Sequence, residues 1–274
     1  MEDILDKDLV GDPSICNLLF RVGKGRLDVA VYSVVHDNSL IYRSFPLGQE
    51  GEDELKSLET TIYDNPLLLA DFRRVHCLVD SGNAMAIPAE VDDAADRERV
   101  FRAAHPSFEG EIFTSSAGVR NGVFTFGLGA PMAGFLRRTF HGVDVECHIA
   151  TLCRYFSTRP GRGNSRRMIC NFRPDAMDVI VTRGADLLLA NTFSFRNPMD
   201  AVYYIMAARH SLGLDPSGDE LLLAGDQNVR SSITPELRRF IGRVMPVIFP
   251  PQMFRSGKES LRVPFDLIIS PICE

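Results

Sequence analysis

The side chains that could catalyse a reaction are scattered and form none of the common catalytic motifs. The sequence contains no GxGxxG, no GxxxxGK[ST] and no GxSxG. Among the cysteines and histidines, Cys147, His148 and Cys153 come nearest to a ligand group, but their spacing matches no common zinc pattern. We therefore predict buried free thiols and packed histidines, with no catalytic residue and no metal site.

Charged residues and glycines at three turns are the candidates for binding a cofactor. These residues are Lys24, Gly25, Arg173, Asp175, Gly225 and Asp226. Lysine and arginine can neutralise a phosphate, and glycine lets backbone N–H groups approach one closely. The simpler interpretation is that all six are ordinary turn residues, since the same residue types are common in exposed turns.

The elements around these turns follow the same order twice. Strands are expected at 16–22, 26–34 and 39–45, followed by a helix through "GEDELKSLETTIYD" and a short strand in "RVHCLVDSG". About 150 residues later, "MICNFRPDAMDVIVTRGADLLLANTF" again predicts three strands, and Asn197 caps a helix before the strand "ELLLAGD". The repeated order predicts two similar lobes, with Asp28 and Asp178 at matching positions.

Three later segments carry more specific expectations. The helix that starts after Asn197 is apolar nearly all round, so we expect it to be buried. A further helix is predicted over 235–244, capped by Thr234 and opened by Pro235. "FDLIIS" near the end of the chain is a candidate final strand.

Composition limits the class of protein. The 274 residues are 45% apolar and carry a net charge of −6, which disfavours a nucleic-acid binder and suggests no nucleic-acid partner. No apolar run approaches the roughly 18 residues that span a bilayer, and the acidic start does not resemble a signal peptide. The four arginines of "STRPGRGNSRR" could hold phosphates, but a solvated connector is the simpler interpretation. We expect a cytoplasmic protein with reduced cysteines and no membrane partner.

The repeated pattern of three antiparallel strands, a helix and a strand resembles the actin-like ATPase fold. More specifically, "NFRPDAMDVIVTRGADLLLANTFSFRNPMDAVYYI" and the terminal "PFDLIISPICE" resemble a bacterial domain-of-unknown-function family with that fold. The resemblance implies an α/β protein with a duplicated actin-like, ribonuclease H-like fold and two βββαβα lobes facing a cleft. We expect the first lobe at 1–160 and the second at 161–274.

The turns depart from the pattern of active members of that superfamily. There, an Asp ends the first strand of each lobe and helps to hold a metal ion, and a Gly follows. Here Arg21 and Val22 stand at the first position, and Asn171 with Arg173-Pro174 stands at the second. Where the superfamily places a Gly-Gly pair on the adenosine side, this sequence has only Gly225-Asp226. The phosphate motifs are degraded.

Two functions remain open at this point. The first is a non-catalytic or weakly nucleotide-binding actin-like protein that serves as an interaction or regulatory module for an unknown protein partner, without a cofactor. The alternative is a nucleotide-binding actin-like ATPase or small-molecule kinase with an atypical cleft, which uses ATP and magnesium at Lys24, Gly25, Gly225 and Asp226. A kinase needs a catalytic aspartate, and Asp80 at the end of "CLVD" is the candidate.

Overall fold

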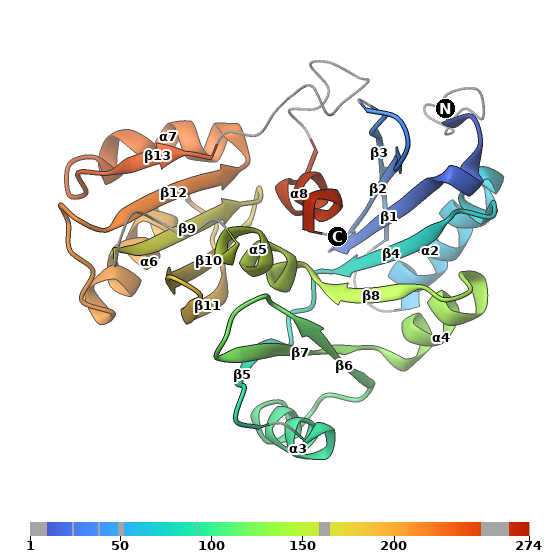
Figure 1. Ribbon diagram of the computed structural model, residues 1–274, viewed down its shortest axis with the longest axis horizontal. Helices are drawn as coiled ribbons and strands as arrows, with labels where there is room; N and C mark the ends of the chain where they lie inside the picture. Colours follow the sequence, from blue (N-terminus) through green and yellow to red (C-terminus); the bar gives the residue numbers. More distant parts are fainter. Residues whose placement is uncertain are drawn as a thin grey trace.

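The computed structural model describes residues 10–23, 25–37, 39–48, 52–91, 93–158, 165–247 and 263–273. They form two five-stranded sheets with helices packed on them and a smaller three-stranded sheet (Figure 1). We call the half built on the first five-stranded sheet lobe one and the half built on the second lobe two.

Lobe one opens with three antiparallel strands and adds two parallel ones. β1 pairs with β2 and β4, β2 with β3, and β4 with β8, which gives the order β3-β2-β1-β4-β8. Its elements are β1 (Cys16–Gly23), β2 (Arg26–Ser33), β3 (Ile41–Pro46), α2 (Glu52–Tyr63), β4 (Arg74–Val79), α4 (Ala130–Thr139), β8 (Asp144–Cys147) and α5 (His148–Ser157), with short 3₁₀ turns at Pro13–Ile15 and Pro66–Leu69.

Lobe two repeats this arrangement strand for strand. Its sheet order is β11-β10-β9-β12-β13, with β12 parallel to β9 and β13 parallel to β12. Its elements are β9 (Arg166–Phe172), β10 (Ala176–Arg183), β11 (Asp186–Ser194), α6 (Pro198–Ser211), β12 (Glu220–Gly225), α7 (Gln227–Leu237), β13 (Val244–Pro246) and α8 (Phe265–Cys273). The predicted repeat is therefore confirmed in strand order and direction, and each lobe adds one strand and one helix to the expected βββαβα.

The smaller sheet belongs to lobe one. The chain leaves β4 through β5 (Ala84–Pro88), α3 (Ala94–Ala104), β6 (Glu111–Ser116) and β7 (Gly122–Leu128) before it reaches α4, and the strands pair in the order β5-β7-β6. Between β12 and β13 of lobe two there is no such described sheet, only α7. The insertion gives lobe one an extra subdomain below the main sheet (Figure 1).

Strands at the centre of each five-stranded sheet are covered on both faces. Every residue of β1 is buried, and so is all of β10 except Arg183. A sheet covered on both sides gives near-continuous apolar strands rather than alternating ones. The polar residues within these strands are therefore buried, and each needs a partner.

Helix α6 begins as the sequence predicts but is not buried all round. Asn197 caps it in a reciprocal capping box with Asp200, and Pro198 is its first residue. Ala201 and Ile205 face the core of lobe two, whereas Tyr203 is 69% exposed. The helix covers only one face of the sheet, so its outer side remains at the surface despite its apolar composition.

The last two helices correct two predictions. α7 spans Gln227–Leu237, not 235–244, because Asp226 rather than Thr234 accepts the capping hydrogen bond, from the Val229 N–H. Pro235 lies in its final turns. "FDLIIS" forms α8 rather than a strand, because the segment packs on another helix instead of on a sheet edge.

Helix α8 follows lobe two in the chain but packs on lobe one. It packs against α5 and touches β1, and Figure 1 shows it between the two main sheets. Phe265 lies 5.7 Å from Tyr155 and 6.0 Å from Phe156, between ring centroids, and Ile268 is buried in the core of lobe one. By order in the repeat, α8 is the counterpart of α5. The lobe boundary near residue 160 stays a prediction, although α8 rests on the core of lobe one.

Candidate functional site at the junction of the lobes

Matching strand positions put polar residues at the junction of the two lobes. Arg21 of β1 faces Asp28 of β2 across the first hairpin, and Asn171 of β9 faces Asp178 of β10 across the second. All four side chains are buried. Asp28 pairs with Arg21 and Asp178 pairs with Asn171 inside the protein, and neither aspartate faces solvent.

Arg21 stands where the resemblance leads one to expect a metal-binding acid. Its Nε donates to Asp266 Oδ2 of α8 at 2.6 Å, and its Nη2 donates to Asp80 Oδ2 at 3.4 Å. Burial alone would lower the pKa of Arg21, but the charges of Asp266 and Asp28 raise it above its ordinary value. Gly23 leaves room for the guanidinium, because a Cβ there would lie 2.9 Å from Arg21 Nη1. Arg21 is therefore a buried cation held by acids from three elements.

Asp28 is held by residues of its own strand β2 and of the neighbouring strands β1 and β3. Its Oδ1 accepts from Tyr42 Oη at 2.7 Å and from Arg26 Nε at 2.7 Å, and its Oδ2 lies 3.7 Å from Arg21 Nη1. Burial, together with the neighbouring Asp28 charge, raises the pKa of Tyr42, so its hydroxyl stays protonated and donates. These contacts hold the Asp28 side chain within lobe one.

Asp178 has more partners than any other carboxylate described at the junction. Its oxygens accept from His148 Nε2 at 3.0 Å, Arg173 Nη2 at 2.8 Å, Thr192 Oγ1 at 2.8 Å and Asn171 Nδ2 at 3.0 Å. Burial alone would raise the pKa of Asp178, but the charges of His148 and Arg173 lower it far below its ordinary value. Asp178 is therefore ionised throughout the physiological range.

His148 is the first residue of α5 in lobe one, and its side chain reaches Asp178 in lobe two. Its Nδ1 faces the Val79 carbonyl at 3.2 Å and its Nε2 faces Asp178. Because both ring nitrogens meet acceptors, only the imidazolium can donate to both. Burial alone would lower the pKa of His148, but the charge and hydrogen bond of Asp178 raise it well above the ordinary value.

Asp80 directly follows β4 and connects lobe one to lobe two. It pairs with Arg173, which follows β9 in lobe two, and also accepts from Arg21. Arg173 in turn bonds Asp178 through its other terminal nitrogen. The candidate catalytic aspartate of the kinase hypothesis is therefore occupied by two guanidinium groups.

These eight charged residues form what we call the junction cluster: Arg21, Arg26, Asp28, Asp80, His148, Arg173, Asp178 and Asp266. Four carboxylates face three guanidinium groups and, with His148 protonated, one imidazolium, so the formal charges cancel. A buried set of charges is stable only when it is balanced and hydrogen-bonded. The formal charges of the cluster balance, and its charged groups are hydrogen-bonded to one another except at two buried atoms, Asp28 Oδ2 and Arg173 Nε, which have no hydrogen-bond partner among the described residues.

This donor set does not fit a magnesium–nucleotide site. Mg²⁺ binds carboxylate and water oxygens, with substrate phosphates beside them. At the two hairpins the positions for the acids carry a guanidinium and an amide, and the nearest carboxylates already hold cations of the protein. Within the described residues, no group of three or more His, Cys, Asp or Glu side chains could hold a metal ion.

The six residues predicted to bind a cofactor do not come together at one site among the described residues. Lys24 lies outside the described residues, and Gly25 forms the β1–β2 turn with a φ of +67°. Asp175 is exposed in the β9–β10 turn, where its carbonyl accepts from Phe195 N. Arg173 lies in the junction cluster.

Gly225 and Asp226 meet lobe two's first strand. Gly225 has a φ of +79°, and a Cβ there would lie only 2.1 Å from the Phe172 carbonyl oxygen. The Asp226 N–H donates to the same oxygen at 2.8 Å, and the Asp226 side chain caps α7. The structure thus brings Gly225 and Asp226 beside the residue that precedes Arg173. Binding of a nucleotide by these residues stays a prediction.

Sequence reasoning missed three members of the cluster: Arg26, His148 and Asp266. His148 was interpreted as core packing beside Cys147, and Asp266 lay within a predicted strand. Each of these two is a charged or titratable residue inside an apolar run, and that is a signal that a buried partner exists elsewhere in the fold. Cys147 and Cys153 are buried free thiols, as predicted.

A second contact joins the lobes at the surface. Arg120, in the turn between β6 and β7, forms a two-pronged ion pair with Asp186 of β11, with distances of 2.8 and 2.9 Å from Nη2. Asn121 exchanges hydrogen bonds with the backbone of Leu187 at 2.8 and 2.9 Å. The inserted subdomain of lobe one therefore holds the edge strand of lobe two.

Comparison with known families decides where the chain belongs. The family model described as "Protein of unknown function (DUF3822)" matches residues 11–244. The chain belongs to the DUF3822 family. In this DUF3822 chain, the matched residues include both hairpins of the junction cluster and end before α8, which supplies Asp266.

Solved structures similar to this DUF3822 chain show its fold. A Bacteroides thetaiotaomicron protein described as having an actin-like ATPase fold and unknown function is 22% identical, with a TM-score of 0.72 over 91% of this chain and 96% of that one. A structure of the PilM–PilN type IV pilus biogenesis complex is 14% identical, with a TM-score of 0.60 over 93% of this chain and 99% of that one. The predicted actin-like fold is confirmed.

A search of curated proteins gives no match to this DUF3822 chain. In the described part of the chain, none of the helices combines the length and the apolar character that crossing a membrane requires.

Proposed function

We propose that this DUF3822 protein is an actin-like interaction module that binds a protein partner and does not turn over ATP. One observation carries the proposal: Arg21 and Arg173 occupy the hairpin ends and pair with Asp80, Asp178 and Asp266. In an actin-like ATPase these hairpins approach the phosphates. Here the two arginines bind acids of the opposite lobe instead: Arg21 binds Asp266, and Arg173 binds Asp80.

The energetics of phosphoryl transfer support the absence of turnover. In that reaction the protein contributes mainly positioning and electrostatic stabilisation by metal ions and cations placed around the phosphates. A carboxylate that already holds two guanidinium groups gains little from a metal ion, and freeing it would leave those cations buried without a partner. Opening this junction for nucleotide would therefore cost several contacts at once.

Contacts between the lobes support a scaffold rather than a moving machine. Ion pairs cross the junction at three places: Arg173 with Asp80, His148 with Asp178, and Arg21 with Asp266 of α8. Arg120 with Asp186 adds a fourth at the surface. Lobes held at several separate points present one fixed surface to a partner, and preorganisation of this kind lowers the entropic cost of binding.

A similar structure gives the interaction role its precedent. The PilM–PilN structure, which shares the fold at a TM-score of 0.60, is a complex between two proteins. An actin-like fold can thus serve for binding a protein, although a shared fold does not fix a function.

Phosphate release tests the proposal. Purified protein is incubated with magnesium and millimolar ATP beside Asp175→Ala and Asp226→Ala variants, and we expect all three to match the background rate. Losing one preorganised element of an active site costs roughly 10²–10³ in rate, and here several are replaced. Turnover by the unmodified protein that disappears in either variant would overturn the proposal in favour of an atypical ATPase.

A further inference from the structure

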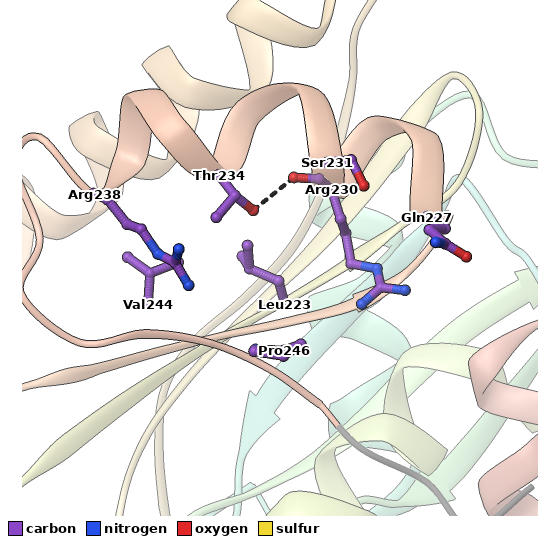
Figure 2. A pocket seen from close by; sticks show the side chains of 8 residues that line it. All are labelled: Leu223, Gln227, Arg230, Ser231, Thr234, Arg238, Val244 and Pro246. Atoms are coloured by element: carbon purple, nitrogen blue, oxygen red, sulfur yellow. Dashed lines mark hydrogen bonds between the residues drawn. The ribbon is translucent and has the colours of Figure 1, made fainter.

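A pocket on lobe two lies apart from the residues of the junction cluster. Its volume is about 350 Å³, and it lies between α7 and the strands β12 and β13 (Figure 2). Its lining consists of Leu223, Gln227, Arg230, Ser231, Thr234, Arg238, Val244 and Pro246. The strands provide an apolar floor, and the helix provides a polar and cationic wall.

The wall follows from the spacing along α7. Arg230, Thr234 and Arg238 are four residues apart, so they lie on one side of the helix. Val229, Ile233 and Leu237 form the buried side instead. The helix therefore uses one side for the core of lobe two and turns a neighbouring side, with two arginines, to the pocket.

Neither arginine has a carboxylate within ion-pair distance among the described residues. Arg230 Nε donates to the Gly225 carbonyl at 3.0 Å, and Figure 2 shows its terminal nitrogens pointing toward the floor. Arg238 is exposed and also points toward Val244 and Leu223. Arg239, which does not line the pocket, is by contrast paired with Glu236 at 2.8 Å.

Partial burial makes Arg230 a favourable anion receptor. Burial lowers the pKa of Arg230, and the charge of Asp226 opposes that shift only in part. Asp226 uses its Oδ1 to accept from Val229 N. A cation that is partly desolvated and lacks a direct acid partner gains more from a bound carboxylate than a fully hydrated one does.

We propose that this pocket binds an extended acidic stretch of the protein partner, with the pattern acid–x–apolar–x–acid. The proposal rests on the interaction function above. Arg230 and Arg238 are eight residues apart, which is about 12 Å of helix rise at 1.5 Å per residue. In an extended peptide, residues i and i+4 are about 13 Å apart and lie on the same face as i+2. Two carboxylates can therefore meet the two arginines while the residue between them contacts Leu223 and Val244.

The geometry favours a peptide over a phosphate group. Phosphate sites usually combine a cation with free N–H groups of a helix N-terminus or a glycine-rich loop. Here Asp226 already accepts from the Val229 N–H at the start of α7, and no glycine lines the pocket. A single phosphate would also leave the apolar floor unused.

Fluorescence anisotropy with a labelled peptide tests this assignment. The probe is a twelve-residue peptide with the core Glu-Ser-Leu-Ser-Glu, titrated with the full-length protein. Replacing both Glu by Gln, or making Arg230→Glu or Arg238→Glu in the protein, should each weaken binding by at least about tenfold, because a charge-assisted contact is lost. Arg239→Glu, on the same helix but outside the pocket, is the matched control and should change the affinity less than about twofold.

A charge reversal excludes misfolding as the cause of any loss. The double variant Arg230→Glu/Arg238→Glu should bind a Lys-Ser-Leu-Ser-Lys peptide better than the unmodified protein does. The proposal is overturned if the unmodified protein does not bind the acidic peptide, if the Gln peptide binds equally well, or if Arg239→Glu weakens binding as much as Arg238→Glu. These outcomes are independent of phosphate release, so failure of the pocket and failure of the proposed function are told apart.

Discussion

The two lobes carry different charges at one of two matching positions. Asp28 and Asp178 match each other, but the first strand carries the cation Arg21 in lobe one and the neutral amide Asn171 in lobe two. In lobe one the first strand carries a cation, Arg21, and the helix that reaches it from the other half carries an acid, Asp266. In lobe two the acid is Asp178 on the second strand, and the helix that reaches it carries His148. α5 and α8 are the equivalent helices of the repeat, and each partner residue lies in the helix's first turn.

This difference shows how a duplicated fold can close on itself. The helix that reaches Arg21 carries an acid, and the helix that reaches Asp178 carries a histidine. Each helix therefore brings the opposite charge to the hairpin that it meets. The comparison predicts that the two halves contribute unequally to stability, because Asp178 holds two cations and a hydroxyl, whereas Asp266 shares Arg21 with Asp28 and Asp80.

The largest effect is expected from Asp178→Ala. It leaves His148 and Arg173 without this buried acid, so we expect a loss of about 4 kcal/mol in the free energy of unfolding. Asp266→Ala should cost about 2 kcal/mol, because Arg21 keeps its other acids. Urea unfolding followed by circular dichroism measures both, with the exposed Asp175→Ala as a control near zero. Equal losses at the two sites would refute the asymmetry.

The glycine in the β1–β2 turn, Gly25, and the glycine that ends β12, Gly225, should differ in the same sense. Gly225→Ala combines a positive φ with a Cβ 2.1 Å from a backbone oxygen, so we expect a loss of about 3 kcal/mol. Gly25→Ala has a similar φ, but the nearest atom is 3.8 Å away, so only the backbone strain of about 1 kcal/mol remains. Thermal unfolding of the two variants in parallel checks the order, and a larger loss at Gly25 would contradict it.

The pH dependence of stability should reveal the charge on His148. Its pKa is higher in the folded protein than the ordinary 6.5, so its contribution is complete below about pH 6.5 and is lost as pH rises through the folded pKa. The difference in unfolding free energy between the protein and a His148→Gln variant should therefore shrink between neutral and alkaline pH. A difference that grows with pH would mean that the buried imidazole is neutral.

Asp178 shifts in the opposite direction. Its pKa is lowered in the folded state, so its contribution is present above the unfolded value near 3.9 and is lost only as pH falls below that value. Urea titrations at a series of pH values follow both groups. The pair His148 and Asp178 should accordingly be most stabilising between about pH 4 and 7.

The smallest effect is expected at the surface contact. The side chain of Arg120 is 72% exposed, so its ion pair with Asp186 is screened by solvent, and Arg120→Ala should change the free energy of unfolding less than any other variant here apart from the control Asp175→Ala. Asn121→Ala removes two hydrogen bonds to Leu187 and should cost about 1 kcal/mol. If Arg120→Ala destabilised the protein as much as Asp178→Ala, the surface contact rather than the cluster would hold the lobes.

The strand order could be predicted from the sequence because it depends on local patterns. Apolar strands joined by tight turns recur in both halves, and Asn197 and Pro198 mark the start of α6. α8 could not be predicted in this way, because a short apolar run such as "FDLIIS" suits a strand or a buried helix equally. α7 was misplaced because Pro235 suggested a helix start, whereas Asp226 is the cap.

The junction cluster was only half visible in the sequence. Arg21 and Asn171 could be identified as departures because the two hairpins align with each other. The residues that complete the cluster could not be identified in this way. Asp80 and Asp266 lie 59 and 245 residues along the chain from Arg21, which both of them bind. His148 lies 30 residues from Asp178. Only the fold brings them together, and pairing over such distances leaves no local pattern.

Nucleotide binding tests the central claim most directly. Thermal unfolding is followed with and without magnesium and millimolar ATP, beside a known ATP-binding protein as a positive control. A ligand at 100 times its dissociation constant stabilises a folded protein by about 2.7 kcal/mol, which moves the midpoint by several degrees. Because protein cations hold the carboxylates of the junction, we predict no shift of the midpoint. A reproducible rise with magnesium–ATP, abolished by Asp80→Ala, would show that the junction opens to a nucleotide and would contradict the account.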